Sequence, residues 1–113
     1  MPYKETKNQI VDKSFYFGCD IVVFCKKLKE NHEFEIARQL IKCGTSIGAN
    51  VRESQRGVSK KDFKNKLGIA LKEADETLYW LDLIEETTIE IPDDLKNKCE
   101  ELIKLLVTII KNS

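Results

Sequence analysis

Apolar residues recur at spacings of three and four positions along almost the whole chain, which is the repeat of a helix with one buried face. Polar residues, glycine or proline interrupt this repeat at residues 29–33, 56–59 and 87–93. Three interruptions separate four helices. The predicted helices cover residues 8–29, 34–55, 60–86 and 93–111.

The starts of the last two helices carry capping signals. Ser59 can accept a hydrogen bond from the backbone at Asp62, three residues later. Pro92 suits the first turn of the fourth helix, where its missing N–H is not needed. Because only a few residues join consecutive helices, each helix must run antiparallel to the one before it. The sequence therefore predicts an all-α fold, an up-and-down antiparallel four-helix bundle that forms a single domain over residues 1–113.

Composition narrows the class of protein. The chain is 42% apolar, which is enough for a core, and its 5 glycines and 2 prolines are too few for a fold of many strands. No apolar stretch is long enough to span a bilayer, and the N-terminal residues form no apolar leader. We therefore expect a cytoplasmic protein that does not contact a membrane.

The cysteines are spread along the chain without a C-x-x-C pair, at or near apolar helical positions. They are Cys19, Cys25, Cys43 and Cys99. We expect reduced thiols packed in the core, above all at Cys25 and Cys99, because neither a disulfide framework nor a zinc site is indicated.

Positive and negative side chains are balanced at 19 each, but the predicted topology separates them. The connection between the second and third helices lies at the same end of the bundle as both termini. Its cations are Arg52, Arg56, Lys60, Lys61, Lys64 and Lys66. Acidic residues gather at the opposite end, at Glu85, Glu86, Glu90, Asp93 and Asp94. The basic turn is a candidate contact for RNA phosphates, and the alternative is an ordinary solvated turn.

The helices carry more apolar surface than one core requires. On the third helix a second stripe lies apart from the core face, with Glu73 and Glu76 within it. Its apolar members are Ile69, Trp80, Leu83 and Ile84. We predict that Ile69, Glu73, Glu76, Trp80 and Leu83 form a subunit interface. The alternative is that Trp80 folds over the edge of its own bundle.

Two glycines lie four residues apart within the second predicted helix, at Gly44 and Gly48. Each costs about 1 kcal/mol relative to alanine inside a helix. The close approach of a neighbouring helix would compensate for that cost. The alternative is a helix that breaks near Gly44.

Three segments together resemble a known family. They are residues 44–53, 59–63 and 69–76, and the matching positions are Ser46, Ile47, Asn50, Val51, Glu53, Ser59, Lys60, Phe63, Ile69, Ala70 and Glu76. The chain resembles the four-helix bundle proteins associated with intervening sequences of 23S ribosomal RNA genes. The resemblance implies a ring-like homopentamer with no established enzymatic activity. It also implies kinship with the accessory proteins of diversity-generating retroelements, which bind nucleic acid beside a reverse transcriptase.

Enzyme and metal chemistry find little support in the sequence. Glu73 and Glu76 are spaced like carboxylates of a di-iron bundle, but such sites use Glu-x-x-His, and the single histidine, His32, falls in a turn. We expect these two glutamates to pair with cations across an interface, or with Asn50 and Ser46 in a polar layer. No nucleophile with a basic helper and no glycine-rich phosphate loop is present. We therefore expect neither catalytic residues nor a cofactor.

These observations favour a non-enzymatic homo-oligomer, pentameric by resemblance, whose basic turn contacts RNA or a nucleoprotein. The alternative is a protein-binding adaptor with charged ends and no contact to nucleic acid. An enzyme or metal protein is the third and weakest hypothesis.

Overall fold

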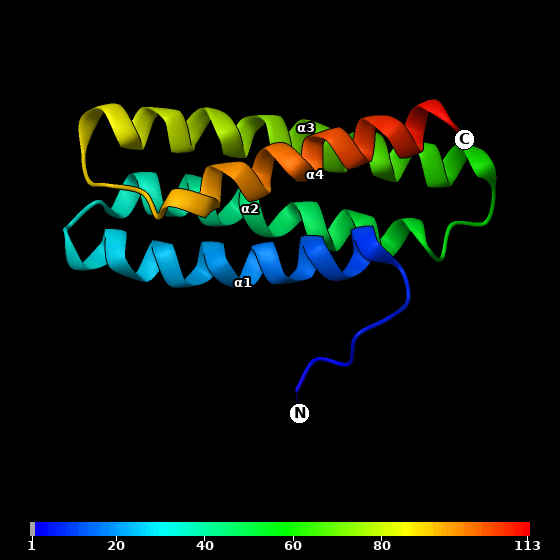
Figure 1. Ribbon diagram of the computed structural model, residues 1–113, viewed down its shortest axis with the longest axis horizontal. Coiled ribbons are helices and arrows are strands. Elements are labelled where there is room, and N and C mark those ends of the chain that lie inside the picture. The colour runs from blue at the N-terminus through cyan, green and yellow to red at the C-terminus, as the bar shows by residue number, and fades with distance from the viewer. Residues whose placement is uncertain (1) are drawn as a thin grey trace.

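The computed structural model describes residues 2–113, which form four helices joined by short turns and no strand (Figure 1). The helices are α1 (Gln9–Glu30), α2 (Phe34–Ser54), α3 (Lys60–Thr87) and α4 (Asp93–Lys111). Each predicted helix is confirmed to within one residue at each end. None of the helices in the described part of the chain has the length and apolar character needed to cross a membrane.

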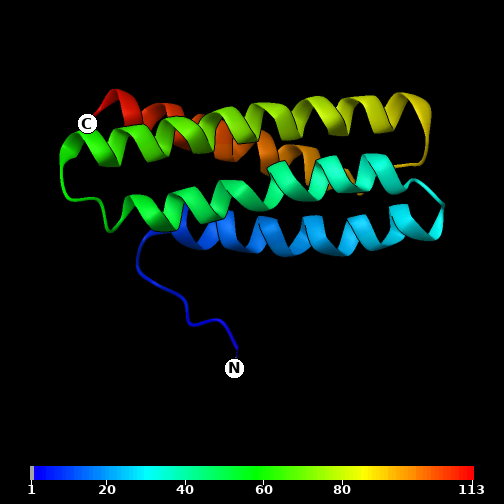
Figure 2. The same ribbon diagram turned by 180° about the vertical axis from the view of Figure 1, so that it is seen from behind.

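The four helices form the predicted up-and-down antiparallel bundle, 44 Å along its longest axis. Around the bundle, α1 packs on α2, α2 on α3, α3 on α4 and α4 on α1, and within residues 2–113 the backbones of the diagonal pairs do not approach each other closely. Figures 1 and 2 show the α2–α3 turn at the same end as the start of α1 and the C-terminus. The topology therefore places the basic turn where the sequence predicts it.

The turn between α2 and α3 is closed by local hydrogen bonds. The backbone N–H of Gly57 donates to the carbonyl of Ser54, the last residue of α2. Ser59 caps α3, because its hydroxyl oxygen accepts from the backbone N–H of Asp62 at 3.1 Å. The predicted cap is confirmed, and it fixes the point at which the cations of α3 begin.

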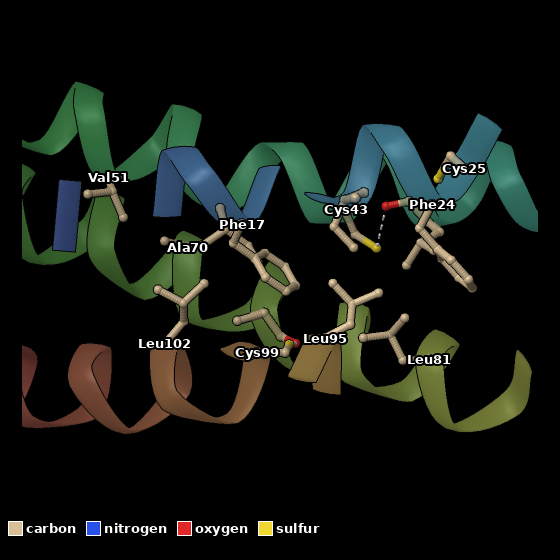
Figure 3. Close-up of a cluster of buried hydrophobic side chains, with 14 of the residues drawn as sticks. Phe17, Phe24, Cys25, Cys43, Val51, Ala70, Leu81, Leu95, Cys99 and Leu102 are labelled. Atoms are coloured by element: carbon tan, nitrogen blue, oxygen red, sulfur yellow. Dashed lines mark hydrogen bonds between the residues drawn. The ribbon is translucent and has the colours of Figure 1, made fainter. Parts of the chain in front are cut away.

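All four helices contribute to one hydrophobic core, as Figure 3 shows for Phe17 of α1, Val51 of α2, Leu81 of α3 and Leu102 of α4. The assignment of Ile84 to an outer stripe is wrong, because its side chain is fully buried in this core. The stripe is narrower than the sequence indicates.

The two glycines of α2 mark its closest approach to α1. A Cβ added at Gly44 would lie 2.8 Å from Cγ2 of Ile21, and one at Gly48 would lie 3.1 Å from the carbonyl oxygen of Ser14. Both partners belong to α1, and α2 continues past both glycines to Ser54. The predicted close approach is confirmed, and the alternative of a helix break at Gly44 is excluded.

The four cysteines are free thiols in two environments. Cys25, Cys43 and Cys99 are buried, and Cys19 is exposed on α1. Burial raises the pKa of Cys25 to about 11 and that of Cys99 to about 12. The expected core positions of Cys25 and Cys99 are confirmed, whereas Cys19 lies outside the core.

We expect a thiol reagent such as DTNB to modify Cys19 alone in the folded protein. The other three thiols are shielded, and their raised pKa values keep them protonated near neutral pH, so the reactive thiolate is scarce. Absorbance should report one thiol in the native protein and four after denaturation. A Cys19→Ser variant should report none before denaturation. Rapid modification of a second thiol in the native wild type would contradict the prediction.

Candidate nucleic-acid interface

The predicted cations at the α2–α3 turn form a cluster that we call the basic rim. It consists of Arg52, Arg56, Lys60, Lys61, Lys64 and Lys66. The rim is contributed by the last turn of α2, the connection, and the first two turns of α3 (Figure 2). All of these side chains are exposed except Lys66, which is half-buried. The fold therefore brings the six cations together at one end of the bundle.

Lys66 differs from the rest of the basic rim, because its ammonium lies 2.8 Å from the Glu53 carboxylate. Within residues 2–113, the other five rim cations have no carboxylate within 4.0 Å. Lys66 thus has a partner inside the subunit and is the rim residue least available to a ligand.

The lysines at the start of α3 oppose the helix dipole. The N-terminus of a helix carries partial positive charge, so cations there are unfavourable by about 0.3–1 kcal/mol each. Lys60 and Lys61 occupy the first two positions of α3. Their ammonium groups have no carboxylate within 4.0 Å in the described part of the chain, although Asp62 in the same turn offsets part of this cost. A bound anion at this end would lower the remaining cost.

The acidic end is neutralised more than the sequence indicates. Lys96 lies 2.8 Å from Asp82 and 2.9 Å from Glu85. Lys98 lies 2.9 Å from Asp20 and 3.3 Å from Asp94. The lysines of α4 pair with carboxylates of α1, of α3 and of the first turn of α4, and they neutralise part of the acidic end, including Glu85 and Asp94. Glu86, Glu90 and Asp93 have no cation within 4.0 Å among residues 2–113, so part of the negative charge at this end stays unpaired.

The N-terminal segment, residues 2–8, also reaches this end of the molecule. The Tyr3 ring stacks on Phe15 of α1 with 3.8 Å between centroids, and its hydroxyl donates to Asp12 at 2.7 Å. Thr6 donates to the same carboxylate from its backbone N–H at 2.9 Å and from its hydroxyl. The Asn8 amide donates to Gln55, just beyond α2, at 3.0 Å. The segment is therefore fixed to the start of α1 and the end of α2.

These contacts shift the pKa values of the residues that hold the segment. The backbone hydrogen bond from Thr6, together with the hydroxyl bonds from Tyr3 and Thr6, lowers the pKa of Asp12. The hydrogen bond to the Asp12 carboxylate is the main reason that the pKa of Tyr3 is raised. Asp12 is therefore ionised and Tyr3 protonated at neutral pH, which are the forms that this contact requires.

The segment places aromatic side chains beside the basic rim. Tyr3, Phe15 and Tyr16 form a cluster, and the Arg52 guanidinium lies 5.9 Å from the centroid of the Phe15 ring. The sequence pattern did not indicate these residues as part of the site, because they lie far from the α2–α3 turn along the chain. The available signal was the concentration of aromatic residues and lysine before and within the first turns of α1.

The residues predicted for a subunit interface are unequally exposed. Ile69 is 43% exposed, and Leu83 is half-buried and outside the core cluster. Trp80 instead packs against the core of its own subunit, borders a recess with Ile36 of α2, and donates to Glu76 at 3.3 Å. Within the subunit, Trp80 thus follows the alternative in which it covers the edge of its own bundle.

The predicted polar layer between α2 and α3 does not form within the subunit. Asn50 donates to the carbonyl of Ser46, and Ser46 donates to the carbonyl of Lys42, so both bonds stay on α2. The polar layer is absent because the backbone carbonyls one turn earlier in α2 are within reach of these short side chains. Glu73 keeps a pKa raised by burial and by the charge of Glu76. Pairing of these glutamates across an interface stays a prediction.

The chain and its fold have counterparts among known proteins. A family model described as 23S rRNA-intervening sequence protein matches residues 6–108. The chain belongs to this family. A similar solved structure is the 1.70 Å crystal structure of a protein with unknown function from the S23 ribosomal protein family of Bacteroides thetaiotaomicron. It is 45% identical with a TM-score of 0.87, and the match covers 90% of this chain and 98% of that chain. No match is found among curated proteins.

Membership of the 23S rRNA-intervening sequence protein family confirms the resemblance seen in the sequence. The structure shows what several motif positions do in this member. Ser46 and Asn50 bond along α2, Glu53 pairs with Lys66 of α3, and Glu76 accepts from Trp80. Three of these hydrogen bonds each lie within a single helix, and the Glu53–Lys66 pair joins α2 to α3.

Proposed function

We propose that the protein is a non-enzymatic homo-oligomer, a pentamer as the family resemblance implies, and that its basic rim binds RNA. One observation carries the proposal: five exposed cations gather at one end of the bundle, with no carboxylate within 4.0 Å in the described chain. They are Arg52, Arg56, Lys60, Lys61 and Lys64.

RNA is the partner that fits this arrangement, because its phosphates repeat along the RNA backbone and each phosphate can pair with one exposed cation. Binding of this kind releases counterions, is insensitive to base sequence and weakens steeply with added salt. In an oligomer with parallel subunit axes, the rims would lie on one side and act together.

Apolar side chains left on the surface support assembly. Val23 is 67% exposed, Tyr79 58% and Val107 46%, in addition to Ile69 of the predicted interface. These side chains lie on α1, α3 and α4, and contact between copies of the chain would remove them from water. Light scattering should therefore give a mass that is a multiple of 13.1 kDa. A particle of a single subunit's mass would overturn the oligomeric part of the proposal.

The RNA part is tested by removing two charges at each end of the bundle in turn. We expect Lys60→Gln with Lys61→Gln to weaken binding of a labelled RNA about tenfold at low salt and to reduce the slope of log K against log salt by about 1.4. The matched control, Lys26→Gln with Lys27→Gln, removes two exposed lysines near the far end of α1 and should change little. Fluorescence anisotropy at 50 and 150 mM salt measures both.

Two results would overturn RNA binding by the rim. One is the absence of binding by the wild type at low salt, which would favour the protein-binding adaptor. The other is an equal loss of RNA affinity in the rim variant and in the control variant. That result would mean that affinity depends on the net charge of the protein and not on the cations at this end of the bundle.

A further inference from the structure

A cleft lies between the N-terminal segment and the end of α2, with a volume of about 400 Å³. Its lining includes three cations, Lys4, Arg52 and Arg56, and no carboxylate. The neighbouring hollow along the α2–α3 turn differs, because Glu53 and Asp62 line it together with Arg56 and Lys66. The charged side chains that line the cleft are thus all positive, whereas those of the hollow beside it are mixed in sign.

The cations of the cleft have no carboxylate within 4.0 Å among residues 2–113. Arg52 lies over the Phe15 ring, a contact that leaves the edge of the guanidinium free to donate hydrogen bonds. Lys4 directly follows Tyr3, which stacks on Phe15 and bonds to Asp12, so the backbone that carries Lys4 is anchored beside the cleft. The Asp12 carboxylate does not line the cleft and is engaged by Tyr3 and Thr6. An anion entering the cleft would therefore meet three cations that no carboxylate neutralises.

The remaining lining adds an aromatic ring and neutral amides. Tyr3 lines the cleft, and so do Asn8 and Gln55, whose side chains bond to each other at 3.0 Å. Proteins hold an unpaired nucleotide with cations that contact its phosphate and with an aromatic ring and amides that contact its base. The volume of about 400 Å³ suits a unit of that size.

We propose that this cleft binds one nucleotide unit of single-stranded RNA, with the phosphate between Lys4, Arg52 and Arg56 and the base against Tyr3. The inference rests on the proposed RNA binding by the basic rim and deepens it. The rim alone would bind any phosphate backbone, whereas the cleft requires a base that is not paired. It therefore adds a preference for single strands over duplexes.

The experiment compares a labelled single-stranded RNA of twelve nucleotides with its duplex, by fluorescence anisotropy at 100 mM salt. We expect the wild type to bind the single strand about tenfold more tightly than the duplex. Lys4→Gln should remove most of that difference. Its matched control is Lys7→Gln, because Lys7 is an exposed lysine of the same segment that does not line the cleft.

Two variants of Tyr3 separate the stacking of its ring on an RNA base from the hydrogen bond by which its hydroxyl anchors the N-terminal segment to Asp12. Tyr3→Phe keeps the ring and loses only the hydroxyl that bonds to Asp12. Tyr3→Leu removes the ring. We expect Tyr3→Leu to abolish the preference for single strands and Tyr3→Phe to retain it in part.

A second readout locates the ligand on the folded protein. Titration with adenosine 5′-monophosphate should shift the amide NMR signals of Lys4, Arg52 and Arg56, and leave those of Lys60 and Lys61 nearly unchanged. Shifts confined to the α3 lysines would overturn the cleft.

The cleft and the basic rim fail in distinguishable ways. If the wild type binds RNA but does not prefer the single strand, or if Lys4→Gln and Lys7→Gln behave alike, the cleft is overturned and RNA binding by the rim stands. If the wild type binds no RNA, the proposed function is overturned and the cleft with it.

Discussion

Gly44→Ala is expected to lower the free energy of unfolding by about 2 kcal/mol, although alanine is the better helix former. The added methyl would lie 2.8 Å from Cγ2 and 2.9 Å from Cγ1 of Ile21. Ile21 is fully buried and branched at Cβ, so it cannot move aside without disturbing the core. Either α1 and α2 separate or Ile21 leaves its preferred rotamer. The free-energy cost of each exceeds the stabilisation that alanine gains from its higher helix propensity.

The matched control for this prediction is Gly68→Ala on α3. A methyl there would meet nothing within 4 Å, so only the helix propensity changes and stability should rise by up to about 1 kcal/mol. Urea unfolding of both variants and the wild type, at one protein concentration, measures the two signs. In thermal unfolding, the Gly44 variant should melt about 8 °C lower than the wild type. Equal stabilisation by both substitutions would show that α1 and α2 are not held close at Gly44.

The number, bounds and order of the helices could be predicted because they depend on local patterns. The apolar repeat is regular through each helix, and the capping residue Ser59 marks the start of α3 as observed. The glycine pair also indicated a close helix contact. It could not say which helix approaches, because α1 and α3 both flank α2, and only the packing shows that the contact is made by α1.

Side-chain partners across helices were predicted less well. The pairs of Lys96 with Asp82 and of Lys98 with Asp20 depend on the rotation and axial position of α4 relative to its neighbours. A shift of α4 by one helical turn relative to its neighbours would give other ion pairs, and the sequence does not determine this axial position. The same applies to Trp80, whose large ring can turn toward the core or toward solvent from one backbone position.

The candidate site was predicted only in the part that is continuous in sequence. The basic rim comes from a single turn and its flanking helix ends, so its residues had to lie together. Tyr3 and Lys4 belong to a segment without any periodicity, and its contact to α2 joins Asn8 to Gln55 across 47 positions. Such a contact depends on two polar side chains and carries no hydrophobic pattern.

Leu81→Ala and Leu83→Ala separate the core of the subunit from its predicted interface. Leu81 is fully buried, so truncation should lower the free energy of unfolding by about 3 kcal/mol through lost burial and the cavity left behind. Leu83 is half-buried on the same helix and lies outside the core cluster. Its truncation should cost the subunit less than about 1 kcal/mol. Urea unfolding of the two variants checks this difference.

Assembly should respond in the opposite order. If another copy of the chain covers the stripe of Ile69 and Leu83, Leu83→Ala removes apolar contact between subunits. The mass of this variant by light scattering should then fall at concentrations where the wild type stays assembled. Leu81→Ala should keep the wild-type mass under conditions where it is still folded, because its side chain is enclosed within one bundle. Unchanged mass for Leu83→Ala, together with a stability loss equal to that of Leu81→Ala, would place the stripe in the subunit's own core and remove it from the interface.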